Sequence, residues 1–164
     1  CLDRAWQCGT VQLDFSLPSR LNASYVGENN ERQVPVMIHR AILGSMERFI
    51  GILTEHYAGA FPTWMAPVQV KILPISEKHV EYAKELAKQM HQDYVRVEVD
   101  DRSEKIGYKI RQAQMAKVPY MLVVGDKEVE EGTVNVRKHG GDELGSVPFE
   151  EFFNSIKIEI KERN

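Results

Sequence analysis

The sequence contains little cysteine and no long apolar segment. Its 164 residues include two cysteines, Cys1 and Cys8, too few for a disulfide framework and typical of a reducing compartment. No stretch approaches the roughly 20 apolar residues that a helix needs to cross a bilayer, and no signal peptide is visible. The chain begins without Met, which suggests a fragment or a processed protein. We expect a cytoplasmic protein with no membrane partner.

Excess positive charge is also absent, and the cations are unevenly distributed. The net charge of −3 gives no overall signature of nucleic-acid binding, so any RNA contact must come from a local patch. Residues 1–63 contain five arginines and no lysine, whereas every lysine follows residue 70. Because arginine suits bidentate recognition and lysine is the usual surface cation, the first third resembles the interior of a larger assembly.

The first part of the chain has the pattern of two short strands followed by a helix. Residues 10–17 alternate between apolar and polar side chains, and residues 34–38 predict a second strand after a polar segment. Residues 42–57 have apolar side chains at helical spacing. Residues 59–67 contain two prolines and a glycine and form the best candidate linker. We therefore expect one domain over residues 1–62 and another over 63–164.

The second part alternates between strand and helix patterns. This alternation predicts an α/β fold in which helices flank a mixed sheet of about five strands. A charged turn is expected at residues 125–128. The expected strands cover residues 68–75, 95–99, 118–124 and 132–137, and the expected helices cover residues 77–91, 104–117 and 149–161.

His39 and Cys8 are the candidate metal ligands of the first part. His39 lies where a strand gives way to a helix, so it could be a metal ligand, a general base or a histidine in an ordinary structural hydrogen bond. No cluster of cysteine and histidine with metal spacing surrounds it, which favours the structural alternative. A pair of Cys8 and His39 would be two ligands short of a closed zinc site, and free cysteines are usually small buried apolar residues.

Arg48 is a candidate anion-binding residue. It lies in an amphipathic segment with Ser45 one turn before it and Gly51 about one turn after it. The arginine could clamp a phosphate group, or it could form a surface ion pair worth less than about 1 kcal/mol. The spacing alone does not decide between these two readings.

Several longer motifs resemble class II aminoacyl-tRNA synthetases, and in particular the threonyl-tRNA synthetase family. Residues 44–49 (GSMERF) resemble motif 3 of this class, and residues 6–15 and 35–48 resemble the threonyl members. Residues 64–70 and 104–111 resemble the anticodon-binding domain of that family, as do residues 118–128. The resemblance covers essentially the whole chain, and it implies that residues 1–62 are the end of an antiparallel catalytic domain.

The resemblance implies a role for each matching residue of the first part. His39 would be one of three zinc ligands, with the other two outside this chain. Arg48 would be the catalytic residue that contacts an ATP phosphate, with Ser45 beside the same site. The substrate pocket would be lined by Gln7, Cys8 and Gln12. Zinc is the implied cofactor, and ATP enters as a substrate with magnesium.

The resemblance also implies an anticodon-binding site in the second part. Its residues would be Ser103, Lys105, Lys117, Glu128 and Arg137. Ser103 and Lys117 stand where relatives often carry asparagine and arginine. Such polar groups read the edges of unstacked bases in single-stranded loops.

The implied parent reaction is the ATP-dependent ligation of threonine to its tRNA through a threonyl-adenylate. The expected partners are threonine tRNA, ATP and threonine, together with a second copy of the chain in a homodimer. Motifs 1 and 2 are absent, so the chain alone is not expected to be an active ligase. The alternative is a non-catalytic module that resembles the anticodon-binding domain and binds RNA or protein.

Overall fold

The computed structural model describes residues 4–141 and 143–163. The chain divides into two compact units, Cys1–His56 and Tyr57–Asn164. Residues 57–62 therefore belong with the second unit, where the Lys117 ammonium donates a hydrogen bond to the carbonyl oxygen of Ala58. Within the described part of the chain, no helix is long and apolar enough to cross a membrane.

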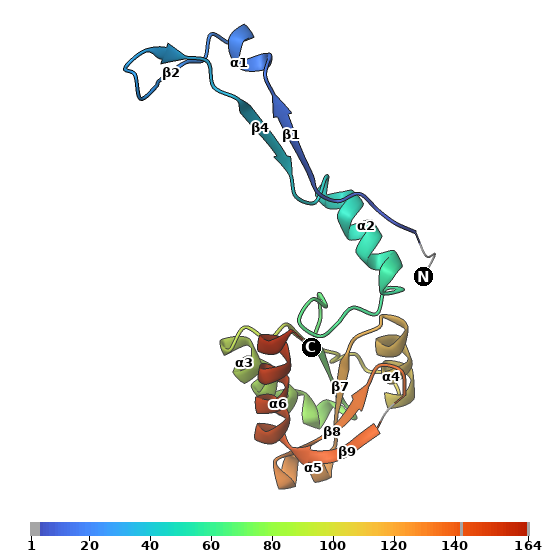
Figure 1. Ribbon diagram of the computed structural model, residues 1–164. Helices are drawn as coiled ribbons and strands as arrows, with labels where there is room; N and C mark the ends of the chain where they lie inside the picture. Colours follow the sequence, from blue (N-terminus) through green and yellow to red (C-terminus); the bar gives the residue numbers. More distant parts are fainter. Residues whose placement is uncertain (1–3, 142, 164) are drawn as a thin grey trace. The chain divides into compact units, whose positions relative to one another are not determined.

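The first unit consists of two separate strand pairs and two helices (Figure 1). The longer pair joins β1 and β4 in an antiparallel ribbon, and the shorter pair joins β2 and β3. The elements are β1 (Thr10–Asp14), α1 (Leu17–Arg20), β2 (Tyr25–Val26), β3 (Arg32–Gln33), β4 (Met37–Ala41) and α2 (Met46–His56).

The first expected strand is shorter than its alternating pattern predicts. It ends at Asp14, because one carboxylate oxygen of Asp14 accepts hydrogen bonds from the backbone N–H groups of Ser16 and Leu17, both at 2.9 Å. This turn leads into helix α1, which begins at Leu17, the last residue of the expected strand. The polar segment after it contains the short β2–β3 pair, where no strand was expected.

The second strand and the first long helix both begin later than expected. Strand β4 covers residues 37–41 instead of 34–38, because its pairing with β1 sets its extent. The helix begins at Met46 instead of residue 42, since Gly44 has a φ of +71° that interrupts a helix. The Ser45 hydroxyl then accepts a hydrogen bond from the Arg48 backbone N–H at 3.2 Å.

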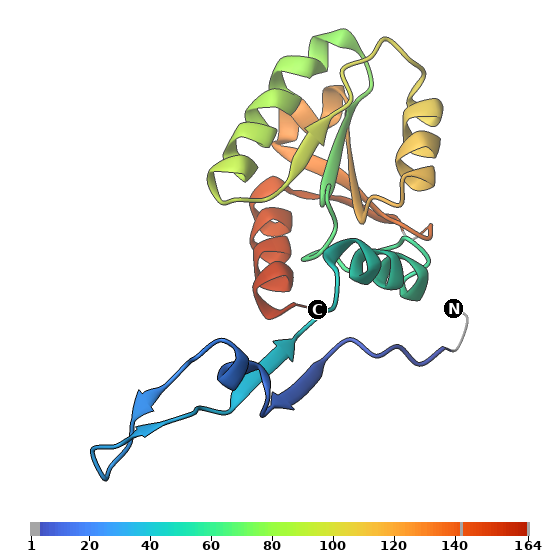
Figure 2. The same ribbon diagram turned by 90° about the horizontal axis from the view of Figure 1, so that it is seen from above.

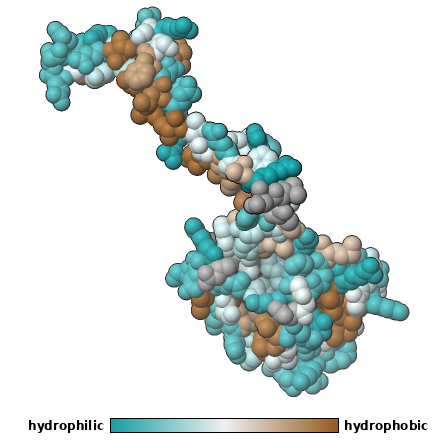
Figure 3. Space-filling view, turned by 45° about the vertical axis from the view of Figure 1, so that its right-hand side comes forward, coloured by the Kyte–Doolittle hydropathy of each residue, from teal (hydrophilic) through white to brown (hydrophobic). Residues whose placement is uncertain are grey.

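The first unit buries almost nothing by itself. Among its described residues, only Pro18 is buried. Apolar side chains of the β1–β4 ribbon remain exposed, including Leu13 at 54% and Ile38 at 65% (Figure 3). Opposed residues of an antiparallel pair project to the same face. The register of Leu13 with Ile38 and of Val11 with Arg40 therefore gives the ribbon one largely apolar face.

The second unit contains a mixed sheet of five strands in the order β6-β5-β7-β8-β9, as the alternation predicted. Strand β5 runs parallel to both β6 and β7, whereas β8 and β9 continue the sheet in antiparallel pairs. Its elements are β5 (Val70–Pro74), the 3-10 turn η1 (Glu77–His79), α3 (Val80–Gln92), β6 (Val97–Val99), α4 (Ile106–Met115), β7 (Tyr120–Val124), α5 (Asp126–Glu131), β8 (Thr133–Lys138), β9 (Glu143–Pro148) and α6 (Phe149–Glu162).

Helices cover both faces of this sheet, so it has two apolar cores (Figure 2). The larger core joins α3 and α6 to one face, and its strand residues include Ile72 and Leu122. The smaller core joins α4 to the other face through Leu73 and Met121. Strand β7 is buried along its whole length, as expected for a central strand.

Two elements of the second unit were not expected. The charged turn at residues 125–128 continues into helix α5, because the Glu128 carboxylate accepts a hydrogen bond from the Gly125 backbone N–H at 2.9 Å. Strand β9 has no alternating apolar pattern, since it lies at the edge of the sheet and forms through its ladder with β8.

Candidate functional site

One face of the β1–β4 ribbon collects the polar residues that the sequence singled out. Gln12 lies directly opposite His39 in the ladder, so the two side chains share a face. Thr10 shares this face because it precedes Gln12 by two residues. The Gln7 amide donates a hydrogen bond to the Thr10 hydroxyl at 2.7 Å. The structure therefore brings Gln7, Gln12 and His39 to one side of the ribbon, opposite its apolar face.

His39 is exposed and has an acidic neighbour. Its Nε2 atom lies 3.3 Å from an Asp14 carboxylate oxygen. The pKa of Asp14 is lowered to about 2, chiefly by the hydrogen bond from the Leu17 backbone N–H, then by that from Ser16, and least by His39. Asp14 is thus ionised at neutral pH, so the His39 ring faces an anionic oxygen.

The described residues do not form a complete metal site. Among them, no group of three or more histidine, cysteine, aspartate or glutamate side chains could hold a metal ion. His39 could supply one imidazole nitrogen, but structural and catalytic zinc sites need three or four protein ligands. Cys8 is half-buried, and its thiol lies 3.9 Å from the Trp6 carbonyl oxygen. The described residues by themselves therefore do not fit a zinc ion.

Arg48 is held against an aromatic ring and not in an ion pair. Its guanidinium carbon lies 5.5 Å from the centre of the Trp6 ring, a distance at which the ring attracts a cation. Arg48 forms no salt bridge with any residue that the structure describes. This contact connects the start of α2 to the segment that carries Gln7 and Cys8. It leaves the guanidinium N–H groups available to an anion.

In the second unit, Ser103 and Lys105 line a cavity at the carboxyl ends of β5 and β6. Ligands of open α/β sheets bind in this position. The cavity has a volume of about 490 Å³, and its other walls come from the segment after β5 and from Lys109. Both Ser103 and Lys105 are exposed. Lys105 occupies the residue before the first turn of α4, where its backbone is extended.

Glu128 lies at the same edge of the sheet. It follows the carboxyl end of β7, and β7 runs parallel to β5. His79, in the segment after β5, reaches the α5 segment, because its Nε2 lies 3.0 Å from an Asp126 carboxylate oxygen. Since the Ser76 backbone N–H donates to Nδ1 of the same ring, Nε2 carries the proton and donates to Asp126. Ser103, Lys105 and Glu128 thus lie at the same end of the parallel strands, and of these three Ser103 and Lys105 line the cavity.

Arg137 and Lys117 lie nearer the opposite end of the strands. Arg137 pairs with Met121 at the start of β7, and its guanidinium donates to the Glu143 carboxylate at 2.8 Å. Lys117 lies just before β7 with a φ of +55°. Because its ammonium already contacts the Ala58 carbonyl oxygen, Lys117 would have to leave the connecting segment to reach RNA.

Comparisons with known proteins identify both units. Residues 69–159 match the anticodon binding domain family. The chain belongs to this family. Residues 1–57 match the class II core domain of the tRNA synthetases for G, H, P, S and T, so the end of such a core precedes the anticodon-binding domain.

A solved structure extends the similarity over both units. It is the crystal structure of the RNA binding domain of threonyl-tRNA synthetase from Cryptosporidium parvum Iowa II, with 37% sequence identity and a TM-score of 0.84. The match covers 96% of this chain and 40% of that chain. The present chain therefore spans well under half the length of the protein that it matches.

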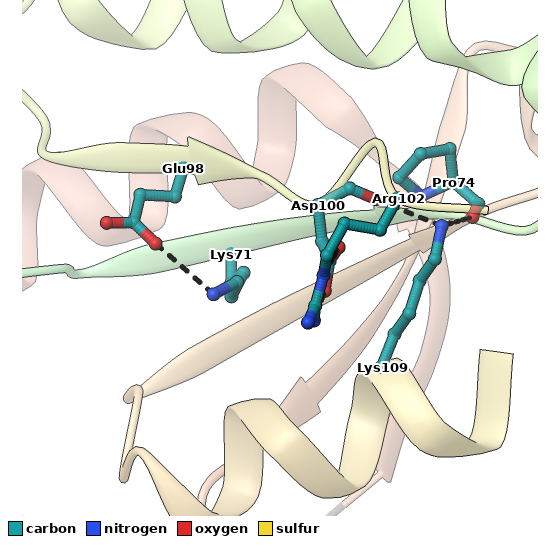
Figure 4. A network of polar contacts seen from close by, with 6 residues as sticks. All are labelled: Lys71, Pro74, Glu98, Asp100, Arg102 and Lys109. Atoms are coloured by element: carbon teal, nitrogen blue, oxygen red, sulfur yellow. Dashed lines mark hydrogen bonds and ion pairs between the residues drawn. The ribbon is translucent and has the colours of Figure 1, made fainter. Parts of the chain in front are cut away.

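Sequence reasoning missed a polar cluster in the anticodon-binding domain. Asp100, Arg102 and Lys109 form connected hydrogen bonds beneath the segment that carries Ser103 and Lys105 (Figure 4). From the sequence alone, Lys109 is expected on a solvated basic helix edge together with Lys105 and Arg111. Helical spacing could have indicated that Lys109 is buried. Lys109 shares a helix face with Ile106, Ile110 and Ala113, which pack into the smaller core.

Proposed function

We propose that the chain is the C-terminal part of a threonyl-tRNA synthetase, which acts in the cytoplasm as a homodimer. The second unit binds the anticodon loop of threonine tRNA, and the first unit contributes to the site that activates threonine with ATP. The observation that carries the proposal is that Ser103, Lys105 and Glu128 lie at the same end of the parallel strands in a domain of the anticodon-binding family. Similarity over both units to the RNA binding domain of a threonyl-tRNA synthetase supports threonine as the amino acid substrate.

The residues at this edge have the chemistry to read an unstacked base. Lys105 offers an exposed ammonium for a phosphate or a base acceptor, and Ser103 offers a hydroxyl that both donates and accepts. Glu128 uses one carboxylate oxygen on the Gly125 backbone, which leaves the other to accept from a base amino group. Arg137 would add a planar donor farther along the sheet. Such contacts read single-stranded loops and tolerate a protein with net negative charge.

In the first unit, Arg48 would hold an oxygen of an ATP phosphate. A guanidinium stays charged and offers fixed donors, so it would stabilise the charge that develops when the threonine carboxylate attacks the α-phosphate and pyrophosphate leaves. The Trp6 ring restricts its orientation beforehand. Ser45 precedes Arg48 just before α2. Gln7, Cys8 and Gln12 would line the part of the substrate pocket that binds threonine. Magnesium would accompany ATP as part of the substrate.

Zinc enters the proposal only through His39. His39 would be one zinc ligand only together with ligands outside the described residues. The zinc would then supply contacts to the amino and hydroxyl groups of threonine, and a site built to bind a hydroxyl rejects valine strongly. In a protein that contains the whole catalytic core, H39A is expected to lower the zinc content measured by atomic absorption. Full zinc content in that variant would remove His39 from the ligand set.

The test for the second unit is RNA binding by the whole chain. The probe is a hairpin with the anticodon stem and loop of a threonine tRNA, and its control is the same hairpin with one anticodon base changed. We expect tighter binding of the first hairpin, weakening with salt in proportion to the phosphate contacts made. Equal affinity for the two hairpins would refute anticodon recognition and favour the alternative of a general RNA-binding or protein-binding module.

The test for the first unit needs the whole catalytic core. There we expect R48A to slow the formation of threonyl-adenylate about 10²- to 10³-fold, the range for removing one donor from a developing charge. Pyrophosphate exchange measures this step. Because Arg48 lies outside the second unit, the same variant should bind the hairpin like the unchanged protein. Undiminished exchange would leave Arg48 with a structural role only.

A further inference from the structure

The ammonium of Lys109 is buried and bound to two backbone carbonyl oxygens. The residue is 3% exposed. Its Nζ atom donates to the carbonyl oxygen of Pro74 at 2.9 Å and to that of Asp100 at 3.0 Å (Figure 4). Burying a lysine is costly unless its charge is paired and hydrogen-bonded. The geometry therefore gives this side chain a specific set of partners in place of water.

These two carbonyl groups lie where two parallel strands separate. Pro74 ends β5, and Asp100 directly follows β6. The ladder between the strands ends at Ile72 and Val99, and one further bond joins the Asp100 N–H to the Ile72 carbonyl oxygen at 2.9 Å. Lys109, on helix α4, joins the two strand ends once more by its hydrogen bonds to Pro74 and Asp100. These bonds hold the ends of β5 and β6 and helix α4 together beneath the cavity.

An ion pair between two side chains, Asp100 and Arg102, also holds this segment in place. The Asp100 carboxylate is 2% exposed and accepts two hydrogen bonds from the Arg102 guanidinium, at 2.7 and 2.6 Å. The Arg102 side chain is half exposed and lies 5.9 Å from the centre of the Tyr108 ring on α4. Arg102 hydrogen bonding is the main cause that lowers the pKa of Asp100, with a smaller contribution from the charge of Lys109.

Ser103 and Lys105, the residues proposed to contact RNA, belong to the segment 100–105 that these contacts hold in place. Ser103 and Lys105 follow Arg102 directly, and the Lys105 carbonyl oxygen accepts hydrogen bonds from the backbone of Tyr108 and Lys109. Residues 100–105 are thus attached at the Asp100 end by Lys109 and at the Lys105 end by the first turn of α4. A loop held in its binding conformation before contact loses less entropy on binding.

We infer that Lys109 is a positioning residue for RNA recognition: it touches no RNA itself, and it holds residues 100–105 so that Ser103 and Lys105 face the anticodon loop. This inference rests on the proposed function, because it assigns Lys109 a task at the same site. Removing the ammonium should therefore weaken binding of the cognate hairpin while the number of phosphate contacts stays the same.

The experiment compares K109M with K105A and with K71M in the whole chain. K71M is the matched control, since Lys71 also pairs across β5 and β6, to Glu98 at 3.2 Å, but does not contact residues 100–105. We expect K109M to lower affinity for the threonine hairpin about tenfold by loosening the segment. The slope of log affinity against log salt should be unchanged in K109M, whereas K105A should reduce it by about 0.7.

Hydrogen exchange provides a readout that needs no RNA. In K109M, the Asp100 amide should exchange faster, while the Leu122 amide in the sheet interior stays protected. If K109M does not fold, R102Q is used instead. It removes the ion pair with Asp100, which holds the same segment, and should lower affinity about threefold. Wild-type affinity of K109M, or a reduced salt slope, would overturn the positioning role. If the unchanged protein binds both hairpins equally, the proposed function fails, and faster exchange at Asp100 would then be a purely structural effect.

Discussion

The two units of this chain use apolar residues in opposite ways. In the second unit, apolar side chains of the sheet are enclosed by α3 and α6 on one face and by α4 on the other. In the first unit, residues of similar size, such as Leu13 and Ile38, remain more than half exposed, and among the described residues only Pro18 is buried. An amino-acid sequence with normal apolar content can thus build one unit with its own core and one without.

The contrast indicates which unit can fold independently. A sheet with two covered faces gains its stability from burial within about one hundred residues. A two-stranded ribbon is marginally stable in water unless something covers its apolar face. The match of residues 1–57 to a class II synthetase core supplies a reason for the exposed face, since in such a core it would be packed against other parts. The comparison can be tested by removing equivalent side chains from each unit.

The largest expected effect comes from substituting two leucines in parallel. L122A creates a cavity in the centre of the sheet, and we expect it to lower the free energy of unfolding by about 2–5 kcal/mol. L13A removes a side chain that is already in water, and it should change stability by no more than about 0.5 kcal/mol. Urea unfolding of the whole chain, followed by circular dichroism, measures both. A loss in L13A as large as that in L122A would show that the ribbon buries its apolar face in solution.

An intermediate effect is expected at the Asp100–Arg102 pair. R102Q leaves a carboxylate that is 2% exposed without its bidentate partner, and we expect a loss of about 1–3 kcal/mol near neutral pH. The pKa of Asp100 is lowered in the folded protein, so its contribution to stability is present above the unfolded value of about 3.9 and is lost as pH falls through the folded value.

The lowered pKa of Asp100 also determines how the stability loss in R102Q changes with pH. Below both pKa values the carboxyl group is protonated in the folded and unfolded states, and the difference between R102Q and the unchanged protein should become smaller. Unfolding curves at about pH 7 and at a series of pH values below the unfolded value of about 3.9 measure the differences. A difference that stays equal at all these pH values would show that the ionised carboxylate is not what the arginine stabilises.

How much could be predicted from sequence also differs between the units. In the second unit, the apolar run at Val118–Val124 and the alternation of patterns predicted a mixed sheet, because burial on both faces leaves a periodic signal. Helix α5 and strand β9 gave no such signal, since one depends on the Glu128 bond to the Gly125 backbone and the other on pairing at an edge. In the first unit, strand ends were displaced because turns at Asp14 and Gly44, not hydrophobicity, determine them.

The sequence named the candidate site residues, whose roles stay predictions, but it did not show which of them lie together. Gln12 and His39 are 27 positions apart, and only the register of the ribbon places them on one face. Lys109 was assigned to a solvated edge because lysine in sequence signals a surface. Its burial depends on two carbonyl oxygens from separate strand ends, which no local pattern encodes.

The smallest effect is expected at Lys117, which tests where the second unit begins. The connecting segment has several other attachments: Arg96 donates to the carbonyl oxygens of Trp64 and Ala66, and Thr63 donates to the Glu159 carboxylate. Removing the Lys117 contact with Ala58 should therefore cost no more than about 0.5 kcal/mol. It should release the part of the segment nearest residue 58, while the later part stays attached. Limited proteolysis of K117M should cut faster at residues 57–60 than in the unchanged protein.

The same variant also tests the anticodon role implied for Lys117. Because the ammonium is already engaged by the connecting segment, we expect K117M to bind the threonine hairpin within about twofold of the unchanged protein, and with the same salt slope. A slope reduced by about 0.7 would mean that Lys117 leaves Ala58 and contacts a phosphate when RNA binds. Arg137, at the same end of the strands, is the comparison, since R137A should weaken binding through a lost base or phosphate contact while the connecting segment keeps its protection.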